Sequence, residues 1–170
     1  MCIRDSIYAM RSLTCSSATW LRPPGPRLAE LIPRRITDVL TRIHHVGIAV
    51  ADLDESIAVY RAALGAKLLH RALNEQEGLE AAFLSTGDGE VELMRATRPE
   101  SPVGKFLAKR GPGLHHVAYG VTNIAQALAD ARAAGLELID SEPRMGMHGS
   151  LIAFVHPKSL GGVLTEFVET

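Results

Sequence analysis

Two copies of one histidine motif lie about 70 residues apart in this chain of 170 residues. The first copy is Ile43-His44-His45-Val46-Gly47-Ile48-Ala49-Val50, and the second is Leu114-His115-His116-Val117-Ala118-Tyr119-Gly120-Val121. If each copy is a β-strand, its side chains alternate between two faces, and the second histidine shares a face with small residues. A histidine among small side chains has the space that a ligand or a catalytic group requires. The repeat therefore points first to His45 and His116.

Two glutamates match these histidines in position. Glu92 follows His45 by 47 residues and Glu166 follows His116 by 50 residues, each in a mostly apolar run that is typical of a strand. Burying a carboxylate in such a strand is costly unless it is paired or bound to a cation. Two neutral imidazoles and two carboxylates together balance the charge of one divalent cation. We therefore predict a metal site formed by His45, Glu92, His116 and Glu166.

Each of these residues taken alone has a simpler interpretation, because a buried histidine is usually hydrogen-bonded and a glutamate on a strand is usually solvated. Their joint occurrence in equivalent places of a repeat favours the metal. Since the set lacks sulfur, it suits a harder divalent ion with open coordination positions, cobalt first and manganese, nickel or zinc as alternatives. A substrate could chelate the ion at those positions. We expect His44 and His115, on the opposite strand faces, to support the ligands or to pack.

The first half reads as one strand, one helix and three further strands. Asp52 and Glu55 form a helix start, and Leu53, Ile57, Tyr60 and Leu64 recur at helical spacing up to Gly65, which fits a left-handed cap. Strands are predicted at residues 66–73, 79–85 and 90–94, with a hairpin turn at residues 87–89 between the last two.

The second half repeats this order. We predict that Thr122 or Asn123 caps a helix that ends at Gly135, and that strands follow at residues 136–140, 151–155 and 163–168. A Gly- and Met-rich loop at 141–149 separates the first two of these strands. The linker at residues 98–113 contains a short predicted helix at 106–110.

This repeat predicts an α+β fold in which two βαβββ modules form a curved mixed sheet, a cup around the metal site. We expect a single domain at residues 41–170, made of module 1 (41–97), the linker (98–113) and module 2 (114–170). A repeat of this length suits a pseudo-symmetric domain and is too long for a solenoid unit. Residues 1–40 differ in composition, and we interpret them as a leader or extension outside the fold.

Composition excludes several classes of protein. The formal net charge of −1 disfavours a general nucleic-acid-binding surface, and no apolar run is long enough to span a membrane. The only cysteines, Cys2 and Cys15, lie outside the predicted domain, which fits a reducing compartment, and we predict the cytoplasm. The first 27 residues hold four arginines and one acid, so a transit peptide to the mitochondrial matrix is the alternative to a misassigned start.

Four further segments complete a recognisable pattern: Asp52-Leu53-Asp54; Lys105-Phe106-Leu107-Ala108-Lys109-Arg110 leading to Gly113-Leu114-His115-His116; Glu142-Pro143-Arg144; and His156-Pro157-Lys158-Ser159 followed by Gly161-Gly162-Val163-Leu164 and Glu166. With the two modules and their His/Glu ligands, residues 42–169 resemble the vicinal oxygen chelate superfamily. Within it they resemble most the methylmalonyl-CoA epimerase family, because the His-Pro-Lys-Ser turn and the Gly-Gly-Val-Leu strand are more specific than the ligands.

The resemblance implies a metal-dependent epimerase that interconverts (R)- and (S)-methylmalonyl-CoA through an enolate. It also implies two partners: an acyl-CoA thioester substrate and a second copy of the chain in a homodimer. A divalent cation would act as a Lewis acid on the thioester carbonyl. The alternatives are a lactoylglutathione lyase of the glyoxalase I type, which can use the same ligands, and a non-catalytic resistance or binding protein of the same fold, which would lack them.

The candidate proton-transfer groups match the family's pattern only in part. The resemblance implies a carboxylate near each face of the substrate, and Glu166 is one candidate, as both ligand and base. Some members carry a second glutamate at the position of Ala81, and here Glu80 lies one place earlier, which turns its side chain to the other face. Glu80 is therefore the weaker candidate. The cations that could meet coenzyme A phosphates are Lys105, Lys109, Arg110, Arg144 and Lys158, and His148 could belong to a lid loop hinged at Gly146 and Gly149.

Overall fold

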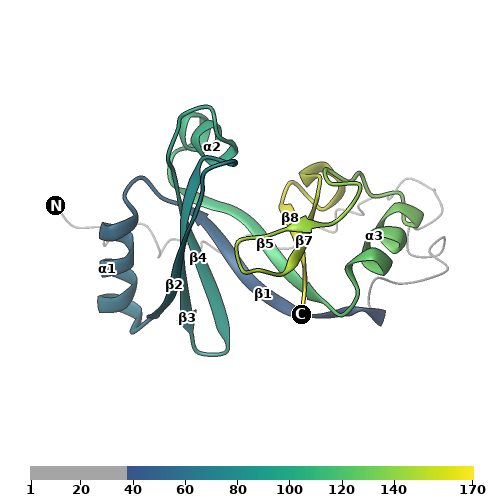
Figure 1. The fold of residues 1–170 in the computed structure, drawn as a ribbon, viewed down its shortest axis with the longest axis horizontal. Coiled ribbons are helices and arrows are strands. Elements are labelled where there is room, and N and C mark those ends of the chain that lie inside the picture. Colours follow the sequence, from purple (N-terminus) through teal and green to yellow (C-terminus); the bar gives the residue numbers. More distant parts are fainter. Residues whose placement is uncertain (1–37) are drawn as a thin grey trace, which may run out of the picture.

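One eight-stranded sheet organises residues 38–170, which are the residues that the structure, a computed structural model, describes. The strand order is β2-β3-β4-β1-β5-β8-β7-β6, so the long strands β1 (Leu40–Ala49) and β5 (Gly113–Val121) are central. They run antiparallel, and each pairs in parallel with the last strand of its own module. Figure 1 shows them crossing the middle of the molecule between the two modules. The predicted α+β fold with a curved mixed sheet is confirmed.

The first module continues with α1 (Leu53–Leu64), β2 (Lys67–Asn74), β3 (Leu79–Thr86) and β4 (Gly89–Ala96). The Asp52 carboxylate caps α1 by accepting a hydrogen bond from the Glu55 amide at 2.9 Å. Gly65 ends the helix with φ 66°, in the left-handed region that glycine adopts without steric cost. Both predicted ends of this helix are confirmed.

The second module contains β5, α3 (Ile124–Ala133), β6 (Arg144–Met145), β7 (Leu151–Val155) and β8 (Leu164–Glu169), with a 3₁₀ turn at Pro157–Ser159. Asn123 caps α3 by accepting from the Gln126 amide at 2.8 Å. The connecting helix α2 (Pro102–Arg110) begins four residues before its predicted start, because Ser101 caps it and Pro102 occupies its first turn.

The predicted strand at residues 136–140 is wrong. Only Leu138 forms a β-bridge there, to Val155, and the short β6 falls inside the predicted loop at 141–149. A few backbone bonds remain at this edge, such as that from the Ile139 amide to the Phe154 carbonyl at 2.8 Å, and side chains bind other amides. The Asp140 carboxylate accepts from the Phe154 amide at 2.9 Å, and the Ser159 hydroxyl accepts from the Glu137 amide at 2.8 Å. Such side-chain bonds satisfy the backbone without a regular strand.

The two faces of the sheet have different surroundings. On the outer face, α1 buries Leu53 and Ile57 against β3 and β4, and α3 buries Leu128 against β7 and β8. These helices lie at the two ends of the molecule in Figure 1. The inner face, which carries His45 and His116, is not covered by α1 or α3 and remains available for a site.

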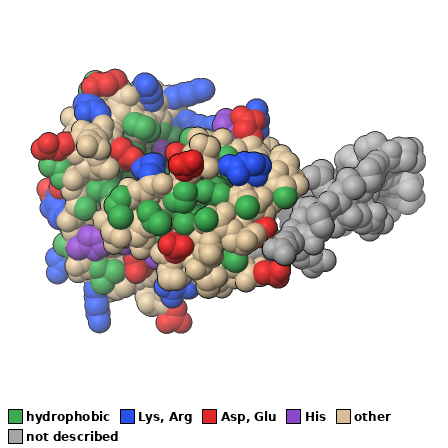
Figure 2. All heavy atoms as spheres, turned by 45° about the vertical axis from the view of Figure 1, so that its right-hand side comes forward, with side chains coloured by type: hydrophobic (Ala, Val, Ile, Leu, Met, Phe, Trp, Pro, Cys, Tyr) green, Lys and Arg blue, Asp and Glu red, His purple; other side chains and the backbone are tan. Residues whose placement is uncertain are grey.

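The surface of the described chain carries both charged and apolar side chains. Figure 2 shows hydrophobic side chains gathered on one face, among acidic and basic ones. Within residues 38–170, no helix combines the length and the apolar composition that crossing a bilayer requires. The predicted leader lies almost wholly outside the described residues.

Candidate metal centre

The strand register brings the four predicted ligands together on the inner face. In the first module Glu92 pairs with Gly47, two residues after His45, and in the second module Glu166 pairs with Ala118, two residues after His116. The antiparallel pairing of β1 with β5 then sets His45 opposite Ala118 and His116 opposite Gly47. The pseudo-two-fold relation predicted from the repeat therefore operates at the level of single residue pairs.

The four side chains converge on one point through single atoms. His45 Nε2 lies 3.1 Å from His116 Nε2. Glu92 Oε2 lies 3.5 Å from the first of these nitrogens and 3.4 Å from the second, and Glu166 Oε2 lies 3.2 Å and 3.4 Å from them. All four residues are buried, with exposures between 2% and 6%. A cluster of this kind needs a positive charge to offset its two carboxylates.

These separations fit a bound divalent cation. Ligands about 2.1 Å from an ion lie about 3.0 Å apart in octahedral and about 3.4 Å apart in tetrahedral geometry. The ligand atoms of His45, His116 and Glu166 all lie within 4.8 Å of one another. Glu166 Oε2 is also buried without a hydrogen-bond partner among the described residues, although it lies close to both imidazoles. An ion at the point of convergence would satisfy this oxygen.

The two preceding histidines contact the rear nitrogens of the ligand rings. His44 Nδ1 lies 2.9 Å from His45 Nδ1, and His115 Nδ1 lies 3.0 Å from His116 Nδ1. Burial, followed by the charge of the neighbouring histidine, lowers the pKa of His44 and lowers the pKa of His115 to about 4. As neutral rings these histidines can orient the ligand imidazoles so that Nε2 faces the cation.

The two carboxylates determine which group of the centre carries a proton. Burial lowers the pKa of His45, but the adjacent carboxylates of Glu166 and Glu92 outweigh this and raise the pKa to about 9. Burial raises the pKa of Glu166, but His116 and His45 outweigh it and lower the pKa to about 2. Without metal, a proton on His45 therefore supplies the positive charge that a cation would otherwise supply.

This exchange of proton for metal predicts a pH dependence of stability. The pKa of His45 is about 9 in the folded chain, above its ordinary value of 6.5. The contribution of His45 to the stability of the fold is therefore complete below pH 6.5 and disappears as the pH rises through 9. We expect the free energy of unfolding of the metal-free protein to fall by roughly 3 kcal/mol over that interval. Urea unfolding at a series of pH values would measure it. The His45→Gln variant should lack this slope, and a wild-type protein without it would contradict the assignment.

A cavity of about 250 Å³ opens at the four ligands. Its walls are otherwise mainly apolar, with Leu79, Met94 and Val103 from the first part of the chain and Ile152, Phe154 and Val168 from the second module. His115, His148 and Glu77 add polar groups to the lining. Sites with an apolar wall and a few convergent polar groups are typical of small-molecule binding.

The structure does not bring Glu80 to this cavity. Glu80 lies on the outer face of β3 and pairs with Arg71 at 2.8 Å and with Arg95 at 2.6 Å. Its neighbour Ala81 is fully buried on the inner face, in the cluster that contains Phe83 and Met94. The alternation of side chains along the strand thus separates Glu80 from the four ligands, as the one-residue offset predicts.

The five predicted cations divide into two groups. Arg144 pairs with Glu77 and Asp140, and Lys158 pairs with Glu137. Lys105, Lys109 and Arg110 line a second groove, of about 320 Å³, next to His115 and Leu164, residues that also line the main cavity. Within residues 38–170 these three cations have no acidic partner within 4.0 Å.

Sequence reasoning missed the importance of two residues at the centre. A Cβ atom at Gly47 would lie 2.1 Å from His116 Cε1, so the His116 ring occupies the space that a side chain here would need. Phe83 lies on the inner face, paired with Glu92, and its ring contacts that of His148. The strand alternation that assigned His45 to a face of small residues could have indicated both positions.

Comparison with known proteins matches this chain to one family. Residues 44–154 match the sequence profile described as the Glyoxalase/Bleomycin resistance protein/Dioxygenase superfamily. The mitochondrial methylmalonyl-CoA epimerase of Mus musculus is 35% identical over 128 residues, 75% of this chain and 72% of that protein. The ethylmalonyl-CoA/methylmalonyl-CoA epimerase of Cereibacter sphaeroides is 35% identical over 130 residues, 75% of this chain and 97% of that protein.

A solved structure of a methylmalonyl-CoA epimerase in complex with methylmalonyl-CoA and NH4+ is similar in fold, with a TM-score of 0.74 and 43% identity. The match covers 77% of this chain and 95% of that one. A lactoylglutathione lyase of Haemophilus influenzae is more distant, 30% identical over 75% of this chain and 92% of that protein. Sequence and structure therefore agree on the same relatives.

Proposed function

The chain belongs to the Glyoxalase/Bleomycin resistance protein/Dioxygenase superfamily, and we propose that within it the chain is an epimerase that interconverts (R)- and (S)-methylmalonyl-CoA. One observation carries the proposal: four buried ligands from two related modules meet at a cavity whose walls are otherwise mainly apolar. The relatives that are described as methylmalonyl-CoA epimerases support the substrate. Ethylmalonyl-CoA is a further candidate, because one relative is named for both thioesters.

We propose that His45, Glu92, His116 and Glu166 hold one divalent cation, cobalt in the first place. When bound, the cation would stabilise negative charge on the substrate carbonyl oxygen as a Lewis acid. The apolar walls exclude water and lower the local dielectric, which strengthens every charge interaction in the cavity. His44 and His115 keep the ligand rings oriented through their Nδ1 contacts.

Glu166 is our candidate for one proton-transfer group. Glu166 lies on β8 and is among the residues that line the cavity. A carboxylate there can take the proton from C2 of the substrate or return one to it. Glu80 has no support in this role, since its carboxylate is held by two arginines on the other face of the sheet.

We propose that the groove at α2 receives the phosphates of coenzyme A. Lys105, Lys109 and Arg110 line it without acidic partners among the described residues, and it adjoins the main cavity at His115 and Leu164. Phosphate groups bind such cations as point charges or, with arginine, through a fork. A thioester in the main cavity could therefore extend its phosphates along α2.

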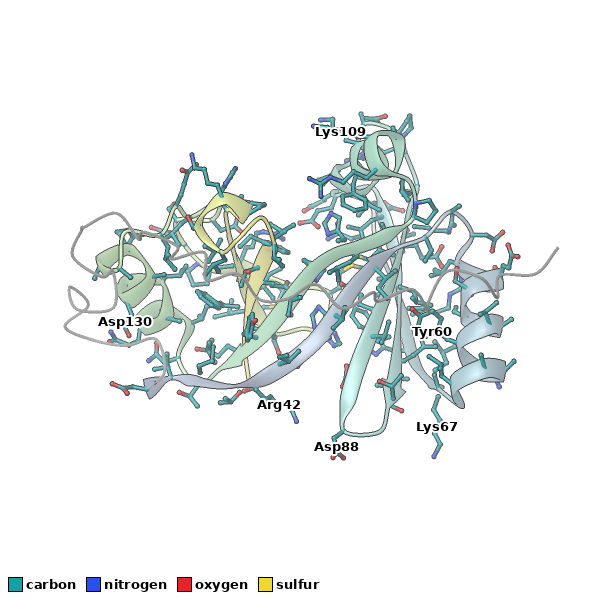
Figure 3. All side chains as sticks on the ribbon, turned by 180° about the vertical axis from the view of Figure 1, so that it is seen from behind. Arg42, Tyr60, Lys67, Asp88, Lys109 and Asp130 are labelled. Atoms are coloured by element: carbon teal, nitrogen blue, oxygen red, sulfur yellow. The ribbon has the colours of Figure 1, made fainter. Side chains whose placement is uncertain are left out.

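Reversing the charge of two cations in the groove at α2 tests this proposal. We expect the double variant Lys109→Glu/Arg110→Glu to raise the KM for the CoA thioester by about tenfold or more and to leave kcat within about twofold, because charge repulsion weakens binding far from the reacting carbon. Steady-state kinetics at low and high salt would measure this. Lys67→Glu is the matched control, since Figure 3 places Lys109 at the top and Lys67 at the bottom of the molecule. Equal effects in both would contradict the groove.

We also propose a homodimer, as the family resemblance implies. An apolar groove of about 410 Å³ on the outer face supports it, because Leu40, Leu160 and Val163 line this groove and are each 37% exposed. A second copy could cover these side chains. Sedimentation at several concentrations would decide between a dimer and a monomer. The cytoplasm remains our proposed compartment, with the mitochondrial matrix as the alternative.

One experiment separates the proposed activity from its nearest rival. The metal-loaded protein is incubated in deuterated water with one epimer of methylmalonyl-CoA and, separately, with the hemithioacetal of methylglyoxal and glutathione. We expect deuterium to enter C2 with loss of optical purity in the first reaction and no lactoylglutathione in the second. Formation of lactoylglutathione without exchange at C2 of the thioester would overturn the proposal.

A further inference from the structure

A hairpin of the second module reaches the inner-face residues of the first module. The hairpin joins β6 to β7, and its turn is closed by the Gly146 amide, which donates to the Ser150 carbonyl at 2.9 Å. Met147 packs against the cluster that contains Ala81 and Phe83. The ring centroid of His148 lies 3.7 Å from that of Phe83, the residue that pairs with Glu92 in the sheet. The hairpin therefore brings an imidazole to the part of the cavity wall beside a metal ligand.

Within residues 38–170, the Nε2 atom of this imidazole has no hydrogen-bond partner. It is buried, and His148 lines the main cavity. Leaving a buried polar atom without a partner costs about 1–3 kcal/mol, so such an atom calls for a functional explanation. The ring itself is fixed, because it lies among the rings of Phe83, His44, His45 and His70 at centroid distances from 3.7 to 5.4 Å.

A second metal ion does not explain this nitrogen well. His44, His45 and His148 each offer a nitrogen within 4.8 Å of the others, and together they could in principle hold an ion. However, the Nδ1 atoms of His44 and His45 already contact each other at 2.9 Å, and His45 Nε2 belongs to the four-ligand centre. A metal ion bound to His148 would therefore lack two further free ligand atoms.

The other polar groups that line the cavity are engaged. Glu77 is paired with Arg144, and His115 contacts His116 through Nδ1. On the inner face of β3, where a carboxylate would complete a pair of proton-transfer groups, the chain has Ala81. His148 rests on Phe83, two residues along the same face of that strand. Among the residues that line the cavity, it is the uncommitted base on the side of the first module, whereas Glu166 stands on β8 in the second. Glu90 Oε2 is also buried without a partner among the described residues, but Glu90 does not line this cavity.

We propose that His148 is the second catalytic residue, which exchanges a proton with C2 of the substrate on the face opposite Glu166. This inference rests on the proposed epimerase function. For one epimer, neutral His148 takes the C2 proton at Nε2, the C–H electron pair moves into the enolate, and a water molecule beside the Glu166 carboxylate gives a proton to the other face of the carbon. For the other epimer, the Glu166 carboxylate takes the C2 proton, and a water molecule beside His148 gives one to the other face. In each case the hydroxide left behind takes the proton from the group that removed it, so both groups return to their starting state.

The test compares proton exchange with inversion in His148→Gln. Each epimer of methylmalonyl-CoA is incubated separately with metal-loaded protein in deuterated water, and NMR follows the C2 proton while an epimer-specific assay follows inversion. We expect inversion to slow by about 100-fold or more, the usual contribution of a positioned acid or base. Loss of the C2 proton should persist, without inversion, from only the epimer whose proton faces Glu166. A merely structural residue would not separate the two processes in this way.

Two controls keep the result specific. His156→Gln alters a histidine that lines neither the main cavity nor the groove at α2, and this variant should retain both processes. The metal content and melting temperature of His148→Gln should match those of the wild type. Equal slowing of exchange and inversion for both epimers, unchanged kinetics, or loss of metal would each overturn the assignment. A wild-type protein without exchange would instead overturn the proposed function, and the inference with it.

Discussion

Replacing His116 by alanine is expected to abolish metal-dependent activity. The substitution removes a buried Nε2 atom that lies 3.1 Å from His45 Nε2 and leaves two carboxylates facing a single imidazole. We expect metal affinity to fall by more than about 100-fold, beyond the range that residues behind the ligands typically produce. The rate should fall by about 1000-fold or more, since the cation supplies several kcal/mol of charge stabilisation. Metal content after gel filtration and steady-state kinetics would measure both.

The neighbouring histidine is the matched control for this prediction. His115→Ala removes the ring that contacts His116 Nδ1 but no atom of the converging set, so we expect affinity to fall by about 10- to 100-fold. The pair His45→Ala and His44→Ala should behave in the same way in the first module. If His115→Ala lost the metal while His116→Ala kept it, the assignment of strand faces would be off by one residue.

Replacing Gly47 by alanine should also remove the metal, although glycine offers no ligand. The new Cβ would lie 2.1 Å from His116 Cε1 and 2.6 Å from His116 Nε2, so the ring must leave its position. We expect a loss of metal affinity of about 100-fold and a destabilisation of the metal-free protein by about 1–3 kcal/mol, as overpacking usually causes. Calorimetric titration of metal and urea unfolding would measure the two effects.

Ala118 provides the control, because it is the pseudo-symmetric counterpart of Gly47 and pairs with His45 in the central strands. Ala118→Gly removes one methyl group and crowds no ligand, so metal affinity should stay within a few-fold while stability falls by roughly 0.5–1 kcal/mol. Wild-type affinity in Gly47→Ala would mean that the His116 ring can move without cost. Metal binding would then not depend on Gly47 as we propose.

The central part of the fold could be predicted because alternation and repetition reinforce each other there. His45 and His116 recur with small residues at every second place, and the capped helix at Asp52 and Gly65 leaves little choice of boundary. The last strand of the first module followed from its alternation and the preceding hairpin turn, and the cost of burying Glu92 and Glu166 without a partner then indicated the metal. Local patterns and long-range pairing agree at these positions, as expected for a site that requires a fixed geometry.

The edge of the second module could not be predicted in this way. Residues 136–140 have a strand-like pattern, but Asp140 and Ser159 satisfy the neighbouring amides with side chains, a long-range arrangement that sequence spacing does not reveal. The role of His148 was open for a similar reason. Its loop is Gly- and Met-rich and lacks periodicity, and only the packing of the hairpin on Phe83 relates it to the ligands.

The central claim is that one divalent cation in the four-ligand centre is required for epimerisation, and reactivation of metal-free protein tests it most directly. Protein freed of metal by a chelator is titrated with cobalt, and the rate of C2 epimerisation of methylmalonyl-CoA is measured at each addition. We expect no activity without metal and a linear rise in rate that ends at one cobalt per chain. Full activity in the metal-free protein, or a rise that continues to two ions per chain, would contradict it.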